Sequence, residues 1–166
     1  MKIVITSDSH GLRDELMELK ELHSDADLFI HCGDSELHKE DPAISGFHIV
    51  KGNCDYGNSF PEELVIAAGK DKIFVAHGHL HHVKINFMPL MYRAQETGAN
   101  IVCFGHTHIL GFEKIDNILF INPGSLRLPR GRKEKTYIVM ETGEEESKKI
   151  IQVYELGKGK LFQEIF

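Results

Sequence analysis

Short apolar runs recur along the chain, and most of them end at a glycine or at an acidic or histidine residue. Such runs, bounded by turn residues, are typical of buried β-strands. Up to residue 104 they alternate with longer polar segments, which predicts parallel strands joined by right-handed crossovers. The strands expected there cover residues 2–6, 27–32, 47–51, 64–68, 72–76 and 101–104, the fourth and fifth as a hairpin-like pair.

Two segments have the spacing of a helix with one apolar face. In residues 12–23 four leucines recur every three or four positions, namely Leu12, Leu16, Leu19 and Leu22. Residues 87–97 form the second segment, with Pro89 near its start and Gly98 directly after its end. Proline and glycine at those positions are usual start and stop signals of a helix. The polar stretch 35–45 is expected to be partly helical.

After residue 104 the apolar runs follow one another with short turns between them. This rhythm predicts antiparallel strands at residues 110–115, 118–121, 136–141, 150–156 and 161–166. The run Glu144-Glu145-Glu146 is expected to be a solvated turn. We therefore expect an α/β fold of two mixed sheets packed face to face with helices outside, in a single domain covering residues 1–166.

Composition and charge narrow the functional class. A chain of 166 residues with 42% hydrophobic and 27% charged residues suits one globular domain. The net charge of −6 argues against a basic nucleic-acid-binding face, so no stable nucleic-acid partner is expected. It is compatible with a nucleotide substrate, because bound metals would supply positive charge locally. Whether the chain forms a homo-oligomer is left open.

The sequence also indicates a compartment. Met1-Lys2 leads directly into an apolar strand, no apolar run reaches membrane-spanning length, and no membrane association is expected. Three cysteines are present without CxxC spacing: Cys32, Cys54 and Cys103. Buried, unpaired cysteines are usual in a reducing compartment, so a cytoplasmic location is expected.

The candidate chemistry lies where the predicted strands end. Five motifs of aspartate, asparagine and histidine follow apolar runs: Asp8-Ser9-His10, Gly33-Asp34, Gly52-Asn53-Cys54-Asp55, His77-Gly78-His79 and Gly105-His106-Thr107-His108. Strands that end at one edge of a sheet deliver such side chains to one place. Carboxylate, amide and imidazole groups together are the composition of a site for two divalent metals.

Each motif alone also has a structural explanation. An Asp-x-His pair such as Asp8 and His10 more often caps a helix or lies on the surface, and Gly33-Asp34 is an ordinary turn signal. The paired histidines are more informative, because ring nitrogens beside apolar runs need partners. His31 lies inside an apolar run and is expected to be a satisfied core histidine rather than a ligand. It is the conjunction of all five motifs that favours a metal centre.

The order of these motifs resembles the calcineurin-like metallophosphoesterase superfamily, and more closely its small bacterial and archaeal phosphodiesterases. The resemblance runs from Met1 to about Glu141 and includes Asn122-Pro123-Gly124-Ser125. It implies a four-layer α/β/β/α sandwich with two metals at the strand ends. One metal would be held by Asp8, His10, Asp34 and His108. The other would be held by Asp34, Asn53, His77 and His106, so that Asp34 bridges the two.

The resemblance implies a metal-dependent phosphoesterase, most often a phosphodiesterase, in which a hydroxide bridging two divalent metals attacks the phosphorus. The catalytic set would be Asp8, His10, Asp34, Asn53 and His79. Mn²⁺ is the first choice of metal, with Fe, Ni or Zn as alternatives. The substrate would be a small phosphate ester or a nucleotide. The competing interpretations are a phosphomonoesterase and a non-catalytic protein-binding scaffold on the same fold.

Two positions depart from the larger relatives. Cys54 and Asp55 stand where those proteins continue with His-Glu, and that histidine helps the leaving group depart. Proton donation would then come from His79 or from water. Arg127, Arg130 and Arg132 form a small basic loop that could contact a phosphate or could simply be solvated.

Overall fold

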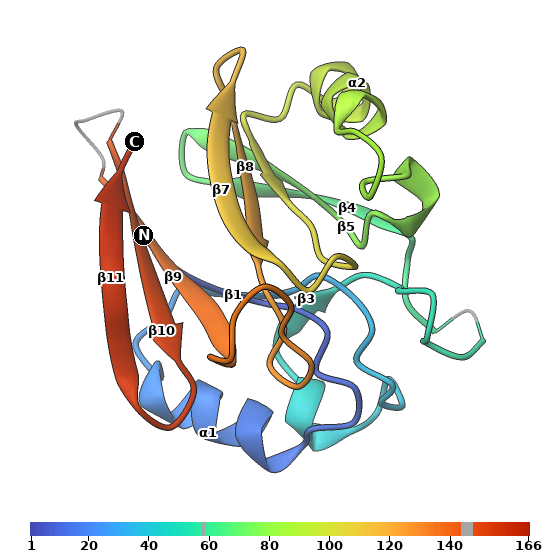
Figure 1. Cartoon of the computed structure of the whole chain (residues 1–166), viewed down its shortest axis with the longest axis vertical. Coiled ribbons are helices and arrows are strands. Elements are labelled where there is room, and N and C mark those ends of the chain that lie inside the picture. The colour runs from blue at the N-terminus through green and yellow to red at the C-terminus, as the bar shows by residue number, and fades with distance from the viewer. Residues whose placement is uncertain (58, 144–147) are drawn as a thin grey trace.

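The computed structural model describes residues 1–57, 59–143 and 148–166 (Figure 1); the turn expected at Glu144-Glu145-Glu146 lies outside them. The described residues form two sheets. The first contains β1 (Lys2–Thr6), β2 (Leu28–His31), β3 (Phe47–Ile49), β9 (Thr136–Thr142), β10 (Lys149–Glu155) and β11 (Gly159–Ile165). The second contains β4 (Glu63–Ala68), β5 (Asp71–Ala76), β6 (Ile101–Cys103), β7 (Leu110–Ile115) and β8 (Ile118–Pro123).

Both sheets are mixed, as predicted. In the first sheet the order is β11-β10-β9-β1-β2-β3, with β1, β2 and β3 parallel and the other neighbours antiparallel. In the second the order is β4-β5-β6-β8-β7, with β5, β6 and β8 parallel. One expectation is wrong: β8, predicted at 118–121 as an antiparallel strand, pairs antiparallel with β7 but parallel with β6. The reason is that the β7–β8 hairpin places its second strand, rather than its first, next to β6.

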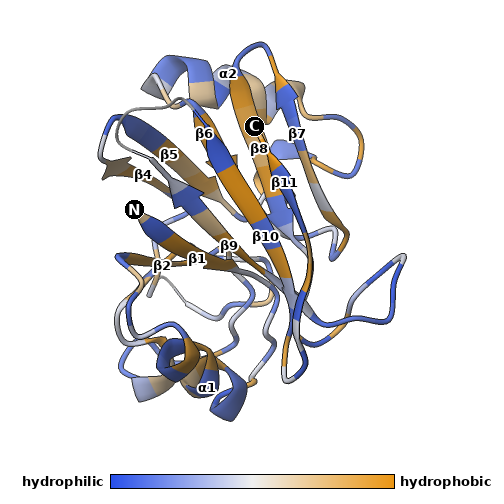
Figure 2. Cartoon of the chain, turned by 90° about the vertical axis from the view of Figure 1, so that its left-hand side faces the viewer, coloured by the Kyte–Doolittle hydropathy of each residue, from blue (hydrophilic) through white to orange (hydrophobic). Residues whose placement is uncertain are grey.

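Alternation of side chains along each strand builds the layers. Ile3 and Ile5 of β1 and Ile73 and Val75 of β5 point into one core between the two sheets. The residues between them point outward, and Val4 belongs to a separate cluster with α1. Hydrophobic residues accordingly gather on the strands, whereas α1 carries both kinds (Figure 2). Helices cover the two outer faces, which confirms the four-layer sandwich (Figure 1).

The helices largely follow the predicted signals. In α1 (Asp14–Leu22) Leu16 and Leu19 are fully buried, but Leu22 is 57% exposed, so the predicted stripe is one residue too long. The reason is that α1 ends at Leu22, at the edge of the surface that it covers. In α2 (Met88–Thr97) the proline stands in the first turn, and Gly98 ends the helix with a left-handed φ of 68°.

Two short 3₁₀ helices complete the described elements. They are η1 (Pro42–Ile44), inside the polar stretch expected to be partly helical, and η2 (His79–His81), directly after β5. In the part of the chain that the structure describes, no helix has the length and apolar character needed to cross a membrane.

The loops that leave the parallel strands meet at one edge of the sandwich. The amide of Asp8 donates to the carbonyl of Gly33 at 3.0 Å, which ties the loop after β1 to the loop after β2. In the second sheet, the amide of Gly105 donates to the carbonyl of His77 at 3.1 Å. These loops carry all five motifs, so the fold brings the predicted ligands to one place.

Candidate metal centre

Strained backbone marks the loops at this edge. Five of the predicted ligands are non-glycine residues with positive φ: Asp8 (52°), His10 (43°), Asp34 (55°), His106 (67°) and His108 (59°). Such a conformation is unfavourable for residues with a Cβ atom and persists only where surrounding contacts enforce it. Its concentration at the predicted ligands indicates that these side chains are held in position for a purpose other than stability.

Asp55 is the main clamp on the loop that carries Asp34. Its carboxylate accepts hydrogen bonds from the amides of Asp34 at 2.9 Å, Gly52 at 2.8 Å and Glu36 at 2.7 Å. The hydroxyl of Ser35 donates to the same carboxylate at 3.1 Å. Four donors on one buried carboxylate fix the loop after β2 against the loop after β3. The sequence places Asp55 in one of the five motifs but does not predict this positioning role, because it does not show which amides a carboxylate reaches.

The Asn122–Ser125 run and Arg127 fasten the other loops. The Ser125 hydroxyl donates to the carbonyl of Asp8 at 2.8 Å, and the Asn122 amide donates to the carbonyl of Gly105 at 3.0 Å. The guanidinium of Arg127 donates to the carbonyl of His10. The run therefore has a positioning role beyond that of a turn between strands.

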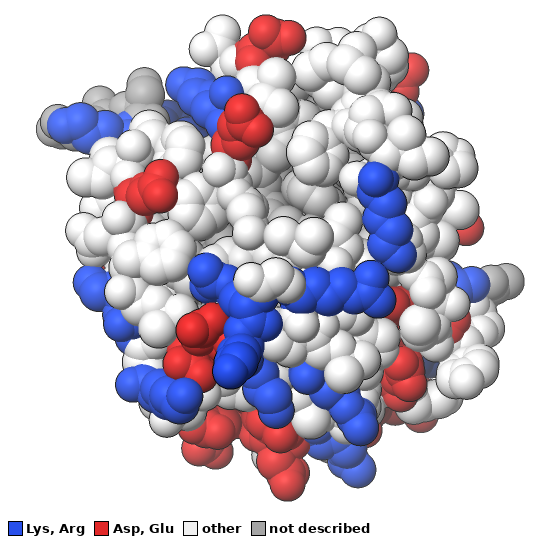
Figure 3. All heavy atoms as spheres, viewed as in Figure 1, with Lys and Arg blue, Asp and Glu red and all other residues white. Residues whose placement is uncertain are grey.

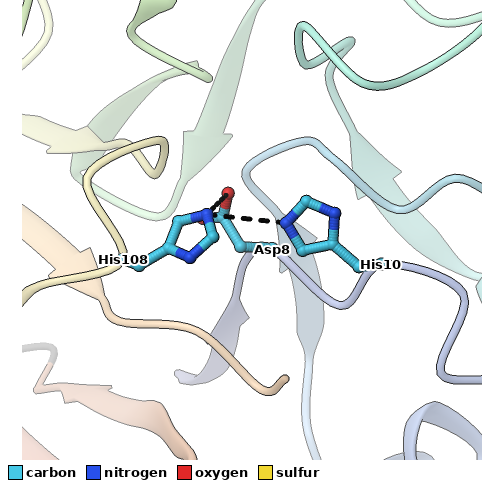
Figure 4. A group of neighbouring side chains, drawn as sticks. All are labelled: Asp8, His10 and His108. Atoms are coloured by element: carbon cyan, nitrogen blue, oxygen red, sulfur yellow. Dashed lines mark hydrogen bonds and ion pairs between the residues drawn. The ribbon is translucent and has the colours of Figure 1, made fainter. Parts of the chain in front are cut away.

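The first ligand group is formed by Asp8, His10 and His108, whose side chains point toward one another (Figure 4). His108 Nε2 lies 3.1 Å from Asp8 Oδ1 and 3.5 Å from His10 Nε2. His108 Nδ1 donates to the carbonyl of Leu128 at 2.7 Å, which leaves the lone pair of the neutral ring on Nε2. His10 is oriented in the same way, because its Nδ1 lies 2.5 Å from Glu36 Oε1.

The second ligand group is formed by Asp8, Asp34 and His77. His77 Nε2 lies 3.3 Å from Asp34 Oδ2 and 3.9 Å from Asp8 Oδ1. The side-chain amide oxygen of Asn53, Oδ1, is 3.2 Å from the same nitrogen of His77. His77 Nδ1 donates to the carbonyl of Cys32 at 2.7 Å, so the lone pair of the neutral ring again faces the other ligands.

These residues fit a pair of cations. Asp8 Oδ1 is buried and has no hydrogen-bond donor among the described residues, although a buried carboxylate oxygen needs a partner. This oxygen lies near Nε2 of His108 and Nε2 of His77, and each of these rings donates its Nδ1 proton to a backbone carbonyl. The side-chain oxygen of Asn53 also lies close to Nε2 of His77. Such a set of lone pairs repels itself unless a positive charge lies between them. Divalent cations bound between them would satisfy this need.

The pKa values give the same indication. Burial lowers the pKa of His77, but contact with Asp34 and the charge of Asp8 outweigh it and raise that pKa above its ordinary value. Contact with Asp8 raises the pKa of His108. Burial raises the pKa of Asp34, but His77 and the Cys54 amide hold it well below its usual range. Without a cation, protons on the rings supply the positive charge that the carboxylates attract.

One part of the predicted ligand scheme looks different in the structure. The residue common to both groups is Asp8, through one oxygen, whereas the resemblance implies that Asp34 bridges. Asp34 Oδ1 accepts a hydrogen bond from the Cys54 amide at 2.7 Å, which leaves Oδ2 for the His77 side. A bridging role of Asp34 stays a prediction.

His106 and His79 lie beside the second group without belonging to it. The ring of His106 is 5.1 Å from that of His77 and 6.1 Å from that of His79, between centroids. Burial and the charges of His77 and Lys84 lower the pKa of His106 to about 4. Burial and the charge of His77 also lower the pKa of His79, whose Nδ1 is buried without a partner in the described part of the chain. The ligand role of His106 and the catalytic role of His79 remain predictions.

The histidine that the sequence assigns to the core is His31, and the structure confirms this assignment. His31 is fully buried, with Ser9 Oγ 2.9 Å from its Nε2 and the Gly33 amide donating to its Nδ1 at 3.2 Å. It is therefore the satisfied core histidine that the sequence predicts. Glu36, which orients His10, has no signal in the sequence beyond its place after Asp34.

The comparisons with known proteins agree with this geometry. The sequence profile of the calcineurin-like phosphoesterase superfamily domain matches residues 1–145, which is most of the chain. The chain belongs to this superfamily. A probable metallophosphoesterase of Bacillus subtilis (strain 168), YsnB, is 49% identical to this calcineurin-like phosphoesterase over 141 residues, with 84% of this chain and 83% of the relative covered.

Solved structures confirm the calcineurin-like phosphoesterase fold. A predicted phosphoesterase from Streptococcus pneumoniae TIGR4 superposes with a TM-score of 0.94 at 35% identity, covering 99% of this chain and 96% of that chain. An archaeal phosphodiesterase has a TM-score of 0.72 at 24% identity, covering 94% and 100%. Vps29 of Entamoeba histolytica, solved with Zn²⁺, has a TM-score of 0.79 at 22% identity, covering 100% and 98%. The last two show the fold alone.

Proposed function

We propose that this calcineurin-like phosphoesterase is a phosphodiesterase that uses two divalent cations. The observation that carries the proposal is the position of Asp8 Oδ1, which lies 3.1 Å from Nε2 of His108 and 3.9 Å from Nε2 of His77. One buried carboxylate oxygen thus serves two ligand groups. A carboxylate shared in this way is the usual means of holding two metals about 3.5–4 Å apart.

The residues hold the centre in complementary ways. Asp8 and Asp34 supply negative charge, and the three histidines His10, His77 and His108 present neutral nitrogens. Asn53 adds an oxygen without charge, and His106 is proposed to complete the second group. Two divalent cations bound there would lower the pKa of a water that they share, so that hydroxide can attack the phosphorus, and would bind the phosphate oxygens. Hydrolysis of a diester then yields a monoester and an alcohol.

No side chain is needed as a covalent nucleophile. Burial and the nearby carboxylates of Asp34 and Glu36 raise the pKa of the Cys54 thiol to about 11. A thiol with this pKa is protonated at neutral pH and is a poor nucleophile. The negative environment that suits cations therefore disables the one cysteine near the centre.

The alcohol that leaves must gain a proton. His79 faces the second ligand group, with its ring 5.4 Å from that of His77, and is the proposed donor. Its lowered pKa means that the ring is neutral at neutral pH, which makes it a weaker acid than an imidazolium. Water is the alternative donor, and an acidic alcohol needs none.

A non-catalytic protein-binding scaffold is the second candidate function, since Vps29 has the same fold. The strained backbone and the burial of the predicted metal ligands favour an enzyme. A protein-binding surface needs neither buried carboxylates nor oriented imidazoles. A phosphomonoesterase is the third candidate and would use the same centre.

The finer assignments belong to this proposal. Mn²⁺ is the proposed metal, with Fe, Ni and Zn as alternatives, because a mixed nitrogen and oxygen site suits several metals. The proposed substrate is a small phosphate ester or nucleotide, acted on in the cytoplasm without a stable nucleic-acid or membrane partner.

The test is a reconstitution with single metals. Protein stripped with a chelator is reloaded with Mn²⁺, Zn²⁺, Ni²⁺ or Fe²⁺ and assayed with bis(p-nitrophenyl) phosphate and with p-nitrophenyl phosphate. We expect no turnover in stripped protein and restored turnover with Mn²⁺, greater on the diester. Turnover restricted to the monoester would make the protein a phosphomonoesterase, and none with any metal would favour the scaffold.

A further inference from the structure

An apolar cavity opens beside the metal centre and has no part in holding it. Its volume is about 460 Å³, within the range of small-molecule sites. It lies between β7 and the segment that leads into α2. Seven of its lining residues have large apolar or aromatic side chains: Val83, Phe87, Phe104, Ile109, Phe112, Ile115 and Phe120. Figure 3 shows a hollow there, walled mostly by uncharged side chains, with lysine and arginine side chains below and beside it and acidic side chains at its upper left.

The cavity adjoins the ligand loops directly. Thr107, which stands between the ligands His106 and His108, is one of its lining residues. Asn122 is another, and its amide donates to the Thr107 hydroxyl at 2.9 Å. A molecule whose phosphate lies at the metal centre therefore has an adjoining cavity for its organic part.

The walls are suited to an aromatic ring. Phe87 packs on Phe104 and Phe120 with ring centroids 5.4 Å and 6.1 Å apart, yet remains 38% exposed. Ile109 is 53% exposed. Exposed apolar and aromatic side chains gathered around a concavity gain free energy when a planar ring covers them.

The two uncharged polar side chains that line the cavity, Asn122 and Thr107, are already engaged. The Asn122 amide donates to Gly105 and Thr107, and its oxygen accepts from the Gly124 amide at 3.0 Å. The Thr107 hydroxyl also accepts from the amide of Ile109 at 3.2 Å. Little hydrogen-bonding capacity is left in the interior to distinguish one polar ring from another. The cavity thus selects shape and apolar character rather than a hydrogen-bonding pattern.

The charges at its edge suit the other end of the same molecule. Lys84 and Arg130 line the cavity, and neither forms an ion pair with any residue that the structure describes. The amide of Arg130 donates to the carbonyl of His108 at 2.9 Å, so this arginine is anchored next to a ligand. One acidic residue, Glu113, also lines the cavity, so the charged lining residues are two cations and one anion. The net positive charge next to the metal centre complements an anionic phosphate that carries an apolar group.

We propose that this cavity binds the aromatic group of an aryl-bearing phosphate diester while the phosphate lies at the metal centre. The inference rests on the proposed function and adds the substrate class. Preferred substrates are those with a planar aromatic group on one ester oxygen, with little discrimination among rings of similar size.

Substitution of Gly111 by a larger residue can fill the cavity. Gly111 lines the space, it lies in the edge strand β7, and a Cβ atom built on it meets nothing within 4 Å. Gly111→Leu therefore introduces bulk without a clash in the fold. Lys114→Leu is the matched control, because Lys114 lies in the same strand and does not line this cavity.

The kinetic test compares bis(p-nitrophenyl) phosphate with methyl p-nitrophenyl phosphate, which share a leaving group and differ in the second ester group. With Mn²⁺-loaded protein we expect a lower KM for the diaryl substrate. Gly111→Leu should raise that KM about tenfold or more, with kcat nearly unchanged and the methyl substrate less affected. Lys114→Leu should match the wild type. Equal KM values for both substrates in every variant would overturn the proposal.

A binding test separates this inference from the proposed function. In metal-stripped protein with labelled isoleucine methyl groups, 1-naphthyl phosphate should shift the signals of Ile109 and Ile115, which both line the cavity. Gly111→Leu should abolish the shifts. Shifts without turnover would leave the cavity assignment standing and remove the enzyme. No shift with the probe, or shifts that follow protein concentration and indicate a second copy of the chain, would overturn it.

Discussion

At the scale of the residue, the centre depends on lone pairs that are aimed by hydrogen bonds on their far side. His77 and His108 each use Nδ1 on a backbone carbonyl, and His10 uses Nδ1 on Glu36. The sequence predicts these histidines as ligands, but it does not predict the groups that orient them, because two of these are the main-chain oxygens of Cys32 and Leu128. In each of these three rings Nε2 is therefore the nitrogen that faces the centre.

The first prediction concerns Asp34. Replacing it with asparagine removes the negative charge next to His77 Nε2 and keeps an oxygen for the Cys54 amide. We expect the second metal to bind at least about a hundredfold more weakly and turnover to fall accordingly. Metal content and diester hydrolysis of Asp34→Asn are measured together. Two tightly bound metals and full activity would show that Asp34 is not a ligand.

The second prediction concerns pH. The pKa values of His77 and His108 are raised in the metal-free fold, so both rings hold protons at a pH where a free imidazole has lost them. A cation must displace these protons. Metal affinity should therefore increase as pH rises through neutrality and level off above the raised pKa values. Calorimetric titration with Mn²⁺ at several pH values checks this, and an affinity independent of pH between 6 and 8 would contradict it.

The third prediction separates Cys54 from His79. A protonated thiol contributes no nucleophile, so Cys54→Ser should keep most of its diesterase activity. If His79 donates the proton, His79→Ala should slow an alkyl diester by about 10²–10⁴-fold and an activated aryl diester much less. Rates are compared at full metal loading. Equal slowing of both substrates, or no slowing, would assign the proton to water.

At the scale of the element, the parallel strands deliver the ligands and the loops after them are locked to one another. The parallel strands predicted before residue 104 are confirmed, because nearly continuous apolar runs such as those of β1 and β5 are a strong signal of buried strands. The strand predicted at 118–121 is present as β8, but it pairs parallel with β6, which a run of short turns does not reveal. The locking was not predictable. It depends on Asp55 accepting from two amides of another loop and one of its own, and on five predicted ligands adopting positive φ. Those are consequences of tertiary contacts rather than of local propensity.

The fourth prediction tests this locking at Gly52. A Cβ atom there would lie 2.0 Å from Asp34 Oδ1, so Gly52→Ala must displace the ligand. We expect loss of metal binding and of turnover, with a decrease of about 1–3 kcal/mol in the free energy of unfolding. Gly111→Ala is the control, because its Cβ meets open space. Metal content and chemical denaturation distinguish the two, and a Gly52→Ala protein with normal metal content would refute the packing argument.

At the scale of the whole molecule, the sandwich places a charged centre and an apolar cavity side by side at one region of its surface. The family and the two mixed sheets follow from the sequence, since each has a local signature, and the same signatures bring the predicted ligand residues together in the structure. The sequence predicts Leu22 on the buried face of its helix, whereas the structure exposes it. A helical stripe of leucines does not show where the underlying sheet ends. The cavity had no signature at all, because its walls come from β7, β8 and the segment before α2, far apart in the chain.

The central claim is that one buried carboxylate, Asp8, organises two metal ions in a single centre. The most direct test is the metal stoichiometry of stripped protein titrated with Mn²⁺, for the wild type and for Asp8→Asn. Asparagine keeps an acceptor for the Ser7 hydroxyl and the His106 amide, so the fold should survive. We predict two ions per wild-type chain and weakened binding of both in Asp8→Asn, with circular dichroism unchanged. Loss of a single ion, with the other bound as in the wild type, would contradict the claim.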